Sequence, residues 1–195
     1  MAKKNKIKNI FLSASVPEPG NKFYEALDVI AIRDAVIALA STVLANPKYH
    51  LIWGGHPSIT PLITLVLDRY GLKMSDRVTL YQSECYRELF PPENQDVGIR
   101  VITEDKGDAE DSLKLMREKM IEENDFVAAV FIGGKEGVLK EFEMFKECHP
   151  DALVLPIAST GAASRNLYEM HLKKFDKRLL TELSYTTLFK ELLGL

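Results

Sequence analysis

A glycine-rich junction in the second half of the chain has the spacing of a site that holds phosphate. Gly133, Gly134 and Gly137 follow an apolar stretch and precede a helical pattern, and Glu141 comes one helical turn after the last glycine. The first N–H groups of a helix carry partial positive charge, and glycine lets a ligand approach them closely. The spacing therefore predicts a phosphate cradle, with the Glu141 carboxylate at its mouth accepting hydrogen bonds from ribose hydroxyls. An exposed carboxylate favoured by the helix end is the alternative.

Three other strand ends are also rich in small residues, and in an open parallel sheet such ends form the ligand crevice. We predict that these loops and the junction converge on one pocket for a polyphosphate or dinucleotide-like ligand, although an isolated glycine pair can serve backbone geometry alone. The further candidates are Ser13, Ala14, Ser15, Gly54, Gly55, His56, Lys135, Glu136, Ser159, Thr160 and Gly161. Glu136 would repel a phosphate, and contact with ribose hydroxyls would suit a ligand richer in sugars.

Two arginines are weighed as phosphate ligands. Arg33 shares a helical stripe with Ile30 and Ile37. An arginine among core-facing residues usually has an anionic partner, which is either a structural carboxylate or the phosphate of a ligand. Arg117 lies on a later helical stretch that could line the pocket, and by itself it would be a surface charge.

Several familiar chemistries lack their sequence signals. Neither glycine turn ends in Gly-Lys-Ser/Thr or forms a Gly-x-Gly-x-x-Gly fingerprint, so ATP hydrolysis and hydride transfer are unsupported. Cys85 and Cys148 are too few and too far apart for a zinc motif, and we expect two free thiols. We expect no metal and no cofactor.

The elements that must position these residues alternate along the chain. Short apolar runs predict strands at residues 9–15, 50–55, 77–83, 99–104, 126–134 and 152–159, and helical patterns cover residues 24–45, 61–70, 109–123, 138–148 and 162–173. Several of the strands are apolar at nearly every position, as in a parallel sheet covered on both faces. The pattern predicts a Rossmann-like α/β three-layer sandwich with a mostly parallel sheet of about six strands. Residues 174–195 add a helical extension. Residues 85–98 are either a lid or a plain surface connection.

Composition limits the classes of partner. The chain has 195 residues, 46% of them hydrophobic, and a net charge of -3, which is ordinary for one domain spanning residues 1–195. The 27% of charged residues are of mixed sign, so we expect no nucleic-acid partner, and the basic start of the chain is read as a solvated terminus. Without a long apolar run or a signal peptide, we expect no membrane partner and a cytoplasmic protein.

Seven segments in order carry a resemblance to a known family. They are "FLSASVPEPG", "IRDAV", "LIWGGHPSITPLI", "LYQSE", "MREKM", "FIGGKEGVLKEFEMF" and "VLPIASTGAAS". Over about residues 9–165 they resemble the SLOG superfamily, and within it a bacterial group with a Gly-Gly-His-Pro-x-Ile-Thr-Pro turn. The last thirty or so residues lie outside the resemblance.

The resemblance implies a Rossmann-like domain that binds nucleotides or nucleotide-derived signals and commonly self-associates. Relatives include the LOG phosphoribohydrolases and the sensor domains of Thoeris antiphage effectors, which recognise cyclic ADP-ribose isomers. Arg117 and Glu141 fall at the catalytic positions of the LOG pattern. Ile132 and Val138 replace its proline and threonine, an additional residue lengthens its glycine turn, and Glu118 breaks its Arg-Lys pair.

Two functions follow as expectations. The first is a cytoplasmic, homo-oligomeric sensor of an NAD-derived molecule, such as ADP-ribose or a cyclic ADP-ribose isomer, in antiphage defence. Its readout would come from self-association or from a separately encoded effector protein. The second is an N-glycosidase that uses Arg117 and Glu141.

Overall fold

A six-stranded, all-parallel sheet forms the centre of the protein. The computed structural model describes residues 7–71, 77–172 and 174–195. The strand order is β4-β3-β2-β1-β5-β6, which confirms the predicted α/β, Rossmann-like fold. The strands are β1 (Lys8–Ser15), β2 (Tyr49–Trp53), β3 (Val78–Ser83), β4 (Ile99–Thr103), β5 (Phe126–Gly133) and β6 (Leu153–Ile157).

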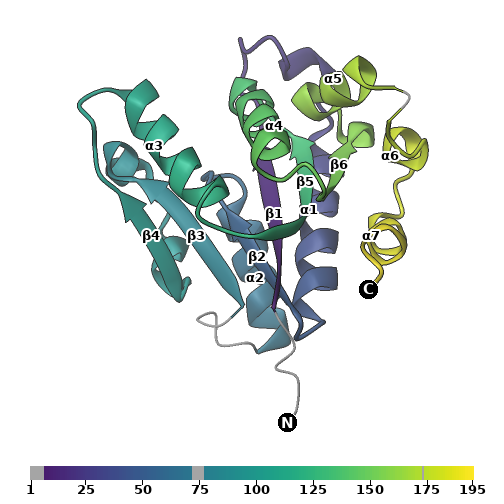
Figure 1. Cartoon of the computed structure of the whole chain (residues 1–195), viewed down its shortest axis with the longest axis horizontal. Helices are drawn as coiled ribbons and strands as arrows, with labels where there is room; N and C mark the ends of the chain where they lie inside the picture. The colour runs from purple at the N-terminus through teal and green to yellow at the C-terminus, as the bar shows by residue number, and fades with distance from the viewer. Residues whose placement is uncertain (1–6, 72–76, 173) are drawn as a thin grey trace.

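Helices cover both faces of the sheet (Figure 1). Helices α1, α2 and α7 pack on one face through a core that includes Ile10, Leu12 and Leu39. Helices α3 and α4 pack on the other face, where Phe11 stacks on Phe145 with ring centroids 5.6 Å apart. The helices are α1 (Val29–Leu44), α2 (Thr60–Tyr70), α3 (Ala109–Ile121), α4 (Glu136–Cys148), α5 (Ala162–Met170), α6 (Arg178–Thr181) and α7 (Tyr185–Leu193). Short 3₁₀ segments are η1 (Tyr24–Ala26), η3 (Glu84–Leu89), η4 (Pro92–Asp96) and η5 (Ala158–Thr160).

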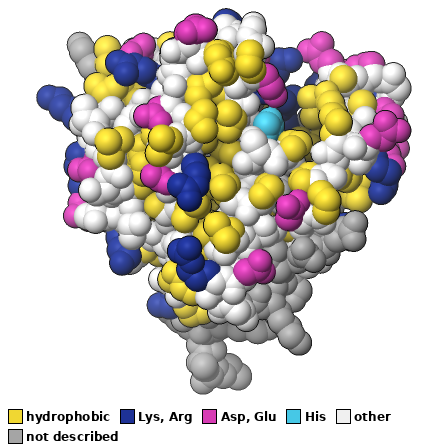
Figure 2. Space-filling model, turned by 180° about the vertical axis from the view of Figure 1, so that it is seen from behind, with side chains coloured by type: hydrophobic (Ala, Val, Ile, Leu, Met, Phe, Trp, Pro, Cys, Tyr) yellow, Lys and Arg dark blue, Asp and Glu magenta, His cyan; other side chains and the backbone are white. Residues whose placement is uncertain are grey.

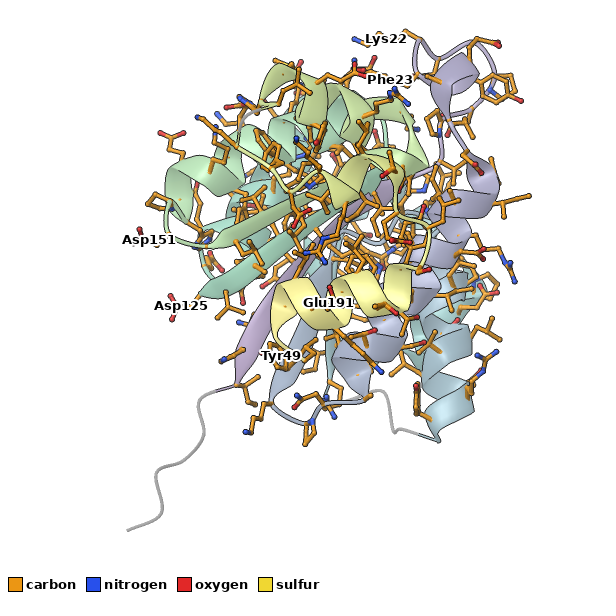
Figure 3. All side chains as sticks on the ribbon, turned by 90° about the vertical axis from the view of Figure 1, so that its right-hand side faces the viewer. Lys22, Phe23, Tyr49, Asp125, Asp151 and Glu191 are labelled. Carbon is orange, nitrogen blue, oxygen red and sulfur yellow. The ribbon has the colours of Figure 1, made fainter. Side chains whose placement is uncertain are left out.

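The order of the strands sets the place where a ligand crevice can open. The chain adds β2, β3 and β4 on one side of β1, then returns to place β5 on its other side. Ser15, at the end of β1, pairs with Gly133, at the end of β5. The loops after β1 and β5 lead to helices on opposite faces of the sheet and leave a crevice between them. Figure 3 shows Lys22 at this end of the molecule and Tyr49, at the start of β2, at the opposite end.

Several predicted boundaries move for local reasons. The helix predicted over residues 24–45 begins at Val29, because Asp28 caps it by accepting a hydrogen bond from the Ala31 N–H at 2.9 Å. Gly54 and Gly55 follow β2 instead of ending it, and α4 begins at Glu136, two residues before the predicted start. Residues 162–170 form α5 as predicted, whereas Lys173 at the predicted end lies outside the described residues.

The C-terminal extension belongs to the main core. Leu188 and Phe189 of α7 are buried in the cluster that also holds α1, and Figure 3 shows α7 in the foreground beside that helix. Most of the basic start of the chain lies outside the described residues. Within the described part, the helices are too short or too polar to cross a bilayer.

Candidate functional site

A cavity of about 860 Å³ lies at the carboxyl edge of the sheet, within the size range of small-molecule pockets. It is bordered by the loops after β1, β2, β3 and β5, by α3 and by the first turn of α4. The lining residues are Leu12, Ser13, Ala14, Ser15, Val16, Pro17, Glu18, Pro19, Asn21, Trp53, Gly54, Gly55, His56, Pro57, Ser58, Ile59, Gln82, Ser83, Tyr86, Leu89, Phe90, Leu113, Met116, Arg117, Lys135, Glu136, Gly137, Val138 and Glu141. Three of the four predicted loops therefore meet at one cavity.

Glu141 and Arg117 form a sheltered ion pair in this cavity. Glu141 Oε1 accepts from Arg117 Nε at 3.2 Å, and Glu141 Oε2 accepts from the Ser13 hydroxyl at 2.5 Å. Their side chains are only 14% and 11% exposed, respectively. These contacts bring together α4, α3 and the end of β1, and they hold the carboxylate in one orientation. A carboxylate fixed in this way can accept hydrogen bonds from ligand hydroxyls.

Gly137 makes room for the arginine. A Cβ atom at this position would lie 3.1 Å from Arg117 Nη2. The guanidinium therefore lies directly over the first turn of α4, where any side chain at position 137 would push it away. The glycine serves a close approach here, which the sequence predicted, but the group that approaches in this structure is an arginine.

Gly133 and Gly134 lie behind the cavity and do not line it. The Gly133 N–H donates to Thr160 Oγ1 at 2.9 Å, and the Gly134 N–H donates to the Ser15 carbonyl at 2.8 Å. These amides hold the turn together. In the first turn of α4, the Val138 N–H donates to the Lys135 carbonyl at 3.0 Å and the Glu136 carboxylate accepts from its own backbone N–H. The Gly137 N–H between them is the amide of this turn that a ligand can meet.

The loop after β6 supports the junction from outside the cavity. Thr160 receives the Gly133 N–H, Ser159 Oγ lies 3.1 Å from the Tyr185 hydroxyl, and Gly161 pairs with Leu27 in an isolated bridge. The prediction that Ser159, Thr160 and Gly161 join the other loops in the cavity is therefore not met. These residues support the site indirectly, because the neighbouring β5 turn lies between them and the cavity.

Comparison with protein-family models identifies the family of the chain. The model of the SLOG cluster3 family matches residues 22–193. The chain belongs to the SLOG cluster3 family. No curated protein matches it. Membership implies that a nucleotide-related ligand is bound or processed. The match includes α6 and α7, which the sequence resemblance had left outside.

Arg33 lies away from the cavity of this SLOG cluster3 protein. Its side chain is 58% exposed and contacts Asp34, with Nη1 and Oδ1 3.1 Å apart. Arg33 does share a stripe with Ile30, but Ile30 is itself 70% exposed, so the prediction of a core-facing arginine is wrong. The buried stripe of α1 instead carries Ile32, Ala35 and Leu39. Figure 2, seen from behind, shows exposed hydrophobic side chains interspersed with charged ones.

The second glycine turn supplies a neutral histidine. The pKa of His56 is lowered from 6.5 to about 4, mainly by burial and also by nearby Lys135, while Glu18 opposes the shift. His56 Nδ1 lies 2.8 Å from Ser58 Oγ and accepts the Ser58 N–H at 3.3 Å. The N–H groups of Ile59 and Thr60 donate to the His56 carbonyl. Because these helix-start amides are already used, this turn is a poorer phosphate cradle than the sequence predicted.

Polar contacts tie the loop after β1 to the start of α4. Lys135 Nζ donates to both oxygens of Glu18 at 2.9 Å, and this hydrogen bond is the main reason why the Glu18 pKa is lowered. Glu136 accepts from Asn21 at 3.2 Å and lies 3.3 Å from Lys22 Nζ. Its pKa is lowered chiefly by its own backbone N–H and then by Asn21. Glu136 is thus engaged at the rim of the cavity.

Sequence reasoning missed one wall of the cavity, the end of β3 and the segment after it. Gln82 and Ser83 are each 2% exposed, and Gln82 Oε1 and Ser83 Oγ have no hydrogen-bond partner among the described residues. Tyr86 and Phe90 follow them along the chain. The sequence signal that could have revealed this wall is the pair of polar residues at the end of an apolar strand. The segment read as a lid or a surface connection therefore contributes a wall of the site.

The described residues contain no group of histidine, cysteine and acidic side chains able to hold a metal ion. Both cysteines are free thiols. The candidate site consists of a hydrogen-bonded carboxylate and arginine, a helix start and a partly aromatic wall.

Proposed function

We propose that this protein binds a sugar-rich nucleotide derivative of the ADP-ribose class, including its cyclic isomers, and releases it chemically intact. The observation that carries the proposal is the position of Glu141, whose side chain is only 14% exposed near the start of α4, in a cavity of about 860 Å³. A fixed carboxylate accepts from ribose hydroxyls, and an adjacent helix start favours phosphate.

The charges of the lining favour sugar over a long phosphate chain. Three carboxylates line the cavity, those of Glu18, Glu136 and Glu141, against two cations, Lys135 and Arg117. Both cations are already paired with carboxylates, and His56 is neutral at physiological pH. A nucleoside triphosphate would meet little uncompensated positive charge, whereas ribose hydroxyls would find acceptors.

The second candidate is an N-glycosidase of the phosphoribohydrolase type. The contact between Arg117 and Glu141 favours it, because these residues match the catalytic positions of the LOG pattern. In this reaction Glu141 would stabilise an oxocarbenium-like ribose while Arg117 held the phosphate. Binding alone is favoured by one observation. The position of the pattern's threonine holds the buried, apolar Val138.

The biological setting follows from the resemblance to Thoeris sensor domains. We propose a role in antiphage signalling, with self-association or a separately encoded effector providing the readout. Light scattering with and without ADP-ribose tests whether the chain associates.

Thermal shift and product analysis together separate the two functions. The wild type and Glu141→Gln are mixed with NAD, ADP-ribose, its cyclic isomers and nucleoside monophosphates. A ligand at about a hundred times its dissociation constant adds about 2.7 kcal/mol to the free energy of unfolding. We expect this shift for at least one wild-type mixture, about ten-fold or greater weakening in Glu141→Gln, and no released base.

The control is Glu143→Gln, the same change on the exposed side of α4. It should bind like the wild type. Steady release of base by the wild type, abolished in Glu141→Gln, would establish the N-glycosidase in place of the binding domain.

A further inference from the structure

Gln82 lines the cavity and has a buried amide oxygen that is unpartnered among the described residues. It is the second-last residue of β3, it is 2% exposed, and its Oε1 atom has no hydrogen-bond partner among the described residues. Buried polar side-chain atoms are paired in the large majority of cases, so an exception that lines a cavity is a candidate ligand contact. The site described around Glu141 does not use this group.

The backbone of Gly55 holds the Gln82 side chain in place. A Cβ atom on Gly55 would lie 2.9 Å from Gln82 Cγ and 2.6 Å from Leu80 Cδ1. The stem of Gln82 is therefore packed under the turn after β2, and its amide is directed by the fold. Gly55 has a φ of 66°, so the left-handed turn and the close packing both select glycine here.

The surroundings of Gln82 suit a flat heteroaromatic group. Tyr86 and Phe90 lie on the segment that follows β3, and Trp53 and Met116 also line the cavity. An apolar, aromatic wall with one directed amide is a typical environment for an aromatic ring that needs a hydrogen bond at its edge. A glutamine amide can meet adenine with two hydrogen bonds, accepting from N6 and donating to N7.

The strand order separates this wall from Glu141. Strand β3 lies two strands from β1, whose Ser13 holds Glu141. Neighbouring strands are about 4.8 Å apart, so the two ends of the cavity are separated by roughly 10 Å. That separation allows one ligand to place a purine base at the β3 end and a ribose hydroxyl at the Glu141 end.

We propose that Gln82 reads the adenine base of the ligand at the β3 end, while Glu141 binds a ribose of the same ligand at the other end. The inference rests on the proposed nucleotide binding and deepens it. It assigns a specificity residue and an orientation for the ligand, and it makes the aromatic wall the base subsite.

Titration calorimetry with three probes tests the assignment. The probes are ADP-ribose, its guanine counterpart GDP-ribose, and ribose 5-phosphate, which has no base. The wild type should bind ADP-ribose about ten-fold more tightly than GDP-ribose. Gln82→Leu replaces the amide with an apolar side chain of similar size. It should weaken the binding of ADP-ribose about ten-fold and leave the binding of ribose 5-phosphate unchanged.

Gln82→Glu provides a second test that keeps a polar side chain. Its carboxylate can accept from N6 but cannot donate to N7, so ADP-ribose binding should weaken about ten-fold, while the preference for ADP-ribose over GDP-ribose should remain, because guanine presents an acceptor at position 6. The assignment is overturned if both variants bind ADP-ribose like the wild type, if ribose 5-phosphate is weakened equally, or if the wild type shows no base preference. Absence of binding for all three probes in the wild type would instead overturn the proposed function itself.

Discussion

At the scale of single residues, His56 gives the cavity a neutral ring and not a positive charge. Its pKa of about 4 lies below the ordinary 6.5 mainly because burial disfavours the charged form. His56 also hydrogen-bonds to Ser58 in the loop before α2, and this contact orders the second glycine turn at the edge of the cavity.

The shift predicts a specific loss of stability in acid. Between pH 6.5 and about 4 the unfolded chain protonates His56 and the folded chain does not, so the free energy of unfolding falls as the pH decreases through this window. The contribution is fully present above pH 6.5 and is at most about 3 kcal/mol. Urea denaturation at several pH values should show this fall in the wild type.

His56→Asn is the matched variant, because its amide oxygen can still accept from the Ser58 N–H. Carboxylates titrate in both proteins, so the difference between the two curves isolates the histidine. Parallel curves from pH 7 to pH 4 would mean that His56 titrates normally in the folded state.

At the scale of elements, the turn between β5 and α4 depends on tight packing. Gly133 has a φ of 58°, and a Cβ atom there would lie 2.5 Å from Ile32 Cδ1 of α1 and 3.0 Å from the Ser15 carbonyl oxygen. Glycine is therefore required at this position both by the left-handed backbone and by the neighbouring helix. The turn fixes where α4 begins, and with it the position of Glu141.

Two glycines with the same backbone angle separate these effects. Gly71, the C-cap of α2, also has a φ of 58°, but a Cβ atom there would meet no atom of the described residues within 4 Å. Gly71→Ala should lower the free energy of unfolding by about 1 kcal/mol, the cost of the left-handed conformation. Gly133→Ala should lower it by about 2–4 kcal/mol, because the steric clash is added. Equal losses in urea denaturation would show that packing around Gly133 contributes nothing.

The sequence predicts the positions of the turns more accurately than the contacts that each turn makes. Strand ends and glycine spacing are local, so the junction near Gly134 and the position of Glu141 could be read directly. The Gly133 N–H donates to Thr160, which lies 27 residues further along the chain. No local sequence pattern predicts this hydrogen bond. Periodicity placed Arg33 on a stripe with Ile30 but could not tell which side of α1 faces the sheet. Gln82 ends an apolar strand without any periodic signal, so only the fold shows that it faces a cavity.

At the scale of the whole molecule, the C-terminal helices complete the helical layer on the α1 face of the sheet. Helix α7 packs against α1, and the Tyr185 hydroxyl lies 3.1 Å from Ser159 Oγ in the loop that supports the β5 turn. Next in that loop, Thr160 receives the Gly133 N–H. The extension is thereby connected to the cavity through consecutive hydrogen bonds. The family match over residues 22–193 agrees with this arrangement, since it treats the extension as part of the same unit.

The central claim is that the cavity binds a nucleotide of the ADP-ribose class intact, and a crystal structure of the protein with saturating ADP-ribose tests it most directly. The account predicts an uncleaved ligand with a ribose hydroxyl within about 3 Å of a Glu141 oxygen, phosphate at the first turn of α4 and adenine beside Gln82. An empty cavity at saturating ligand, a ligand bound elsewhere, or free base with a cleaved ribose in the site would contradict it.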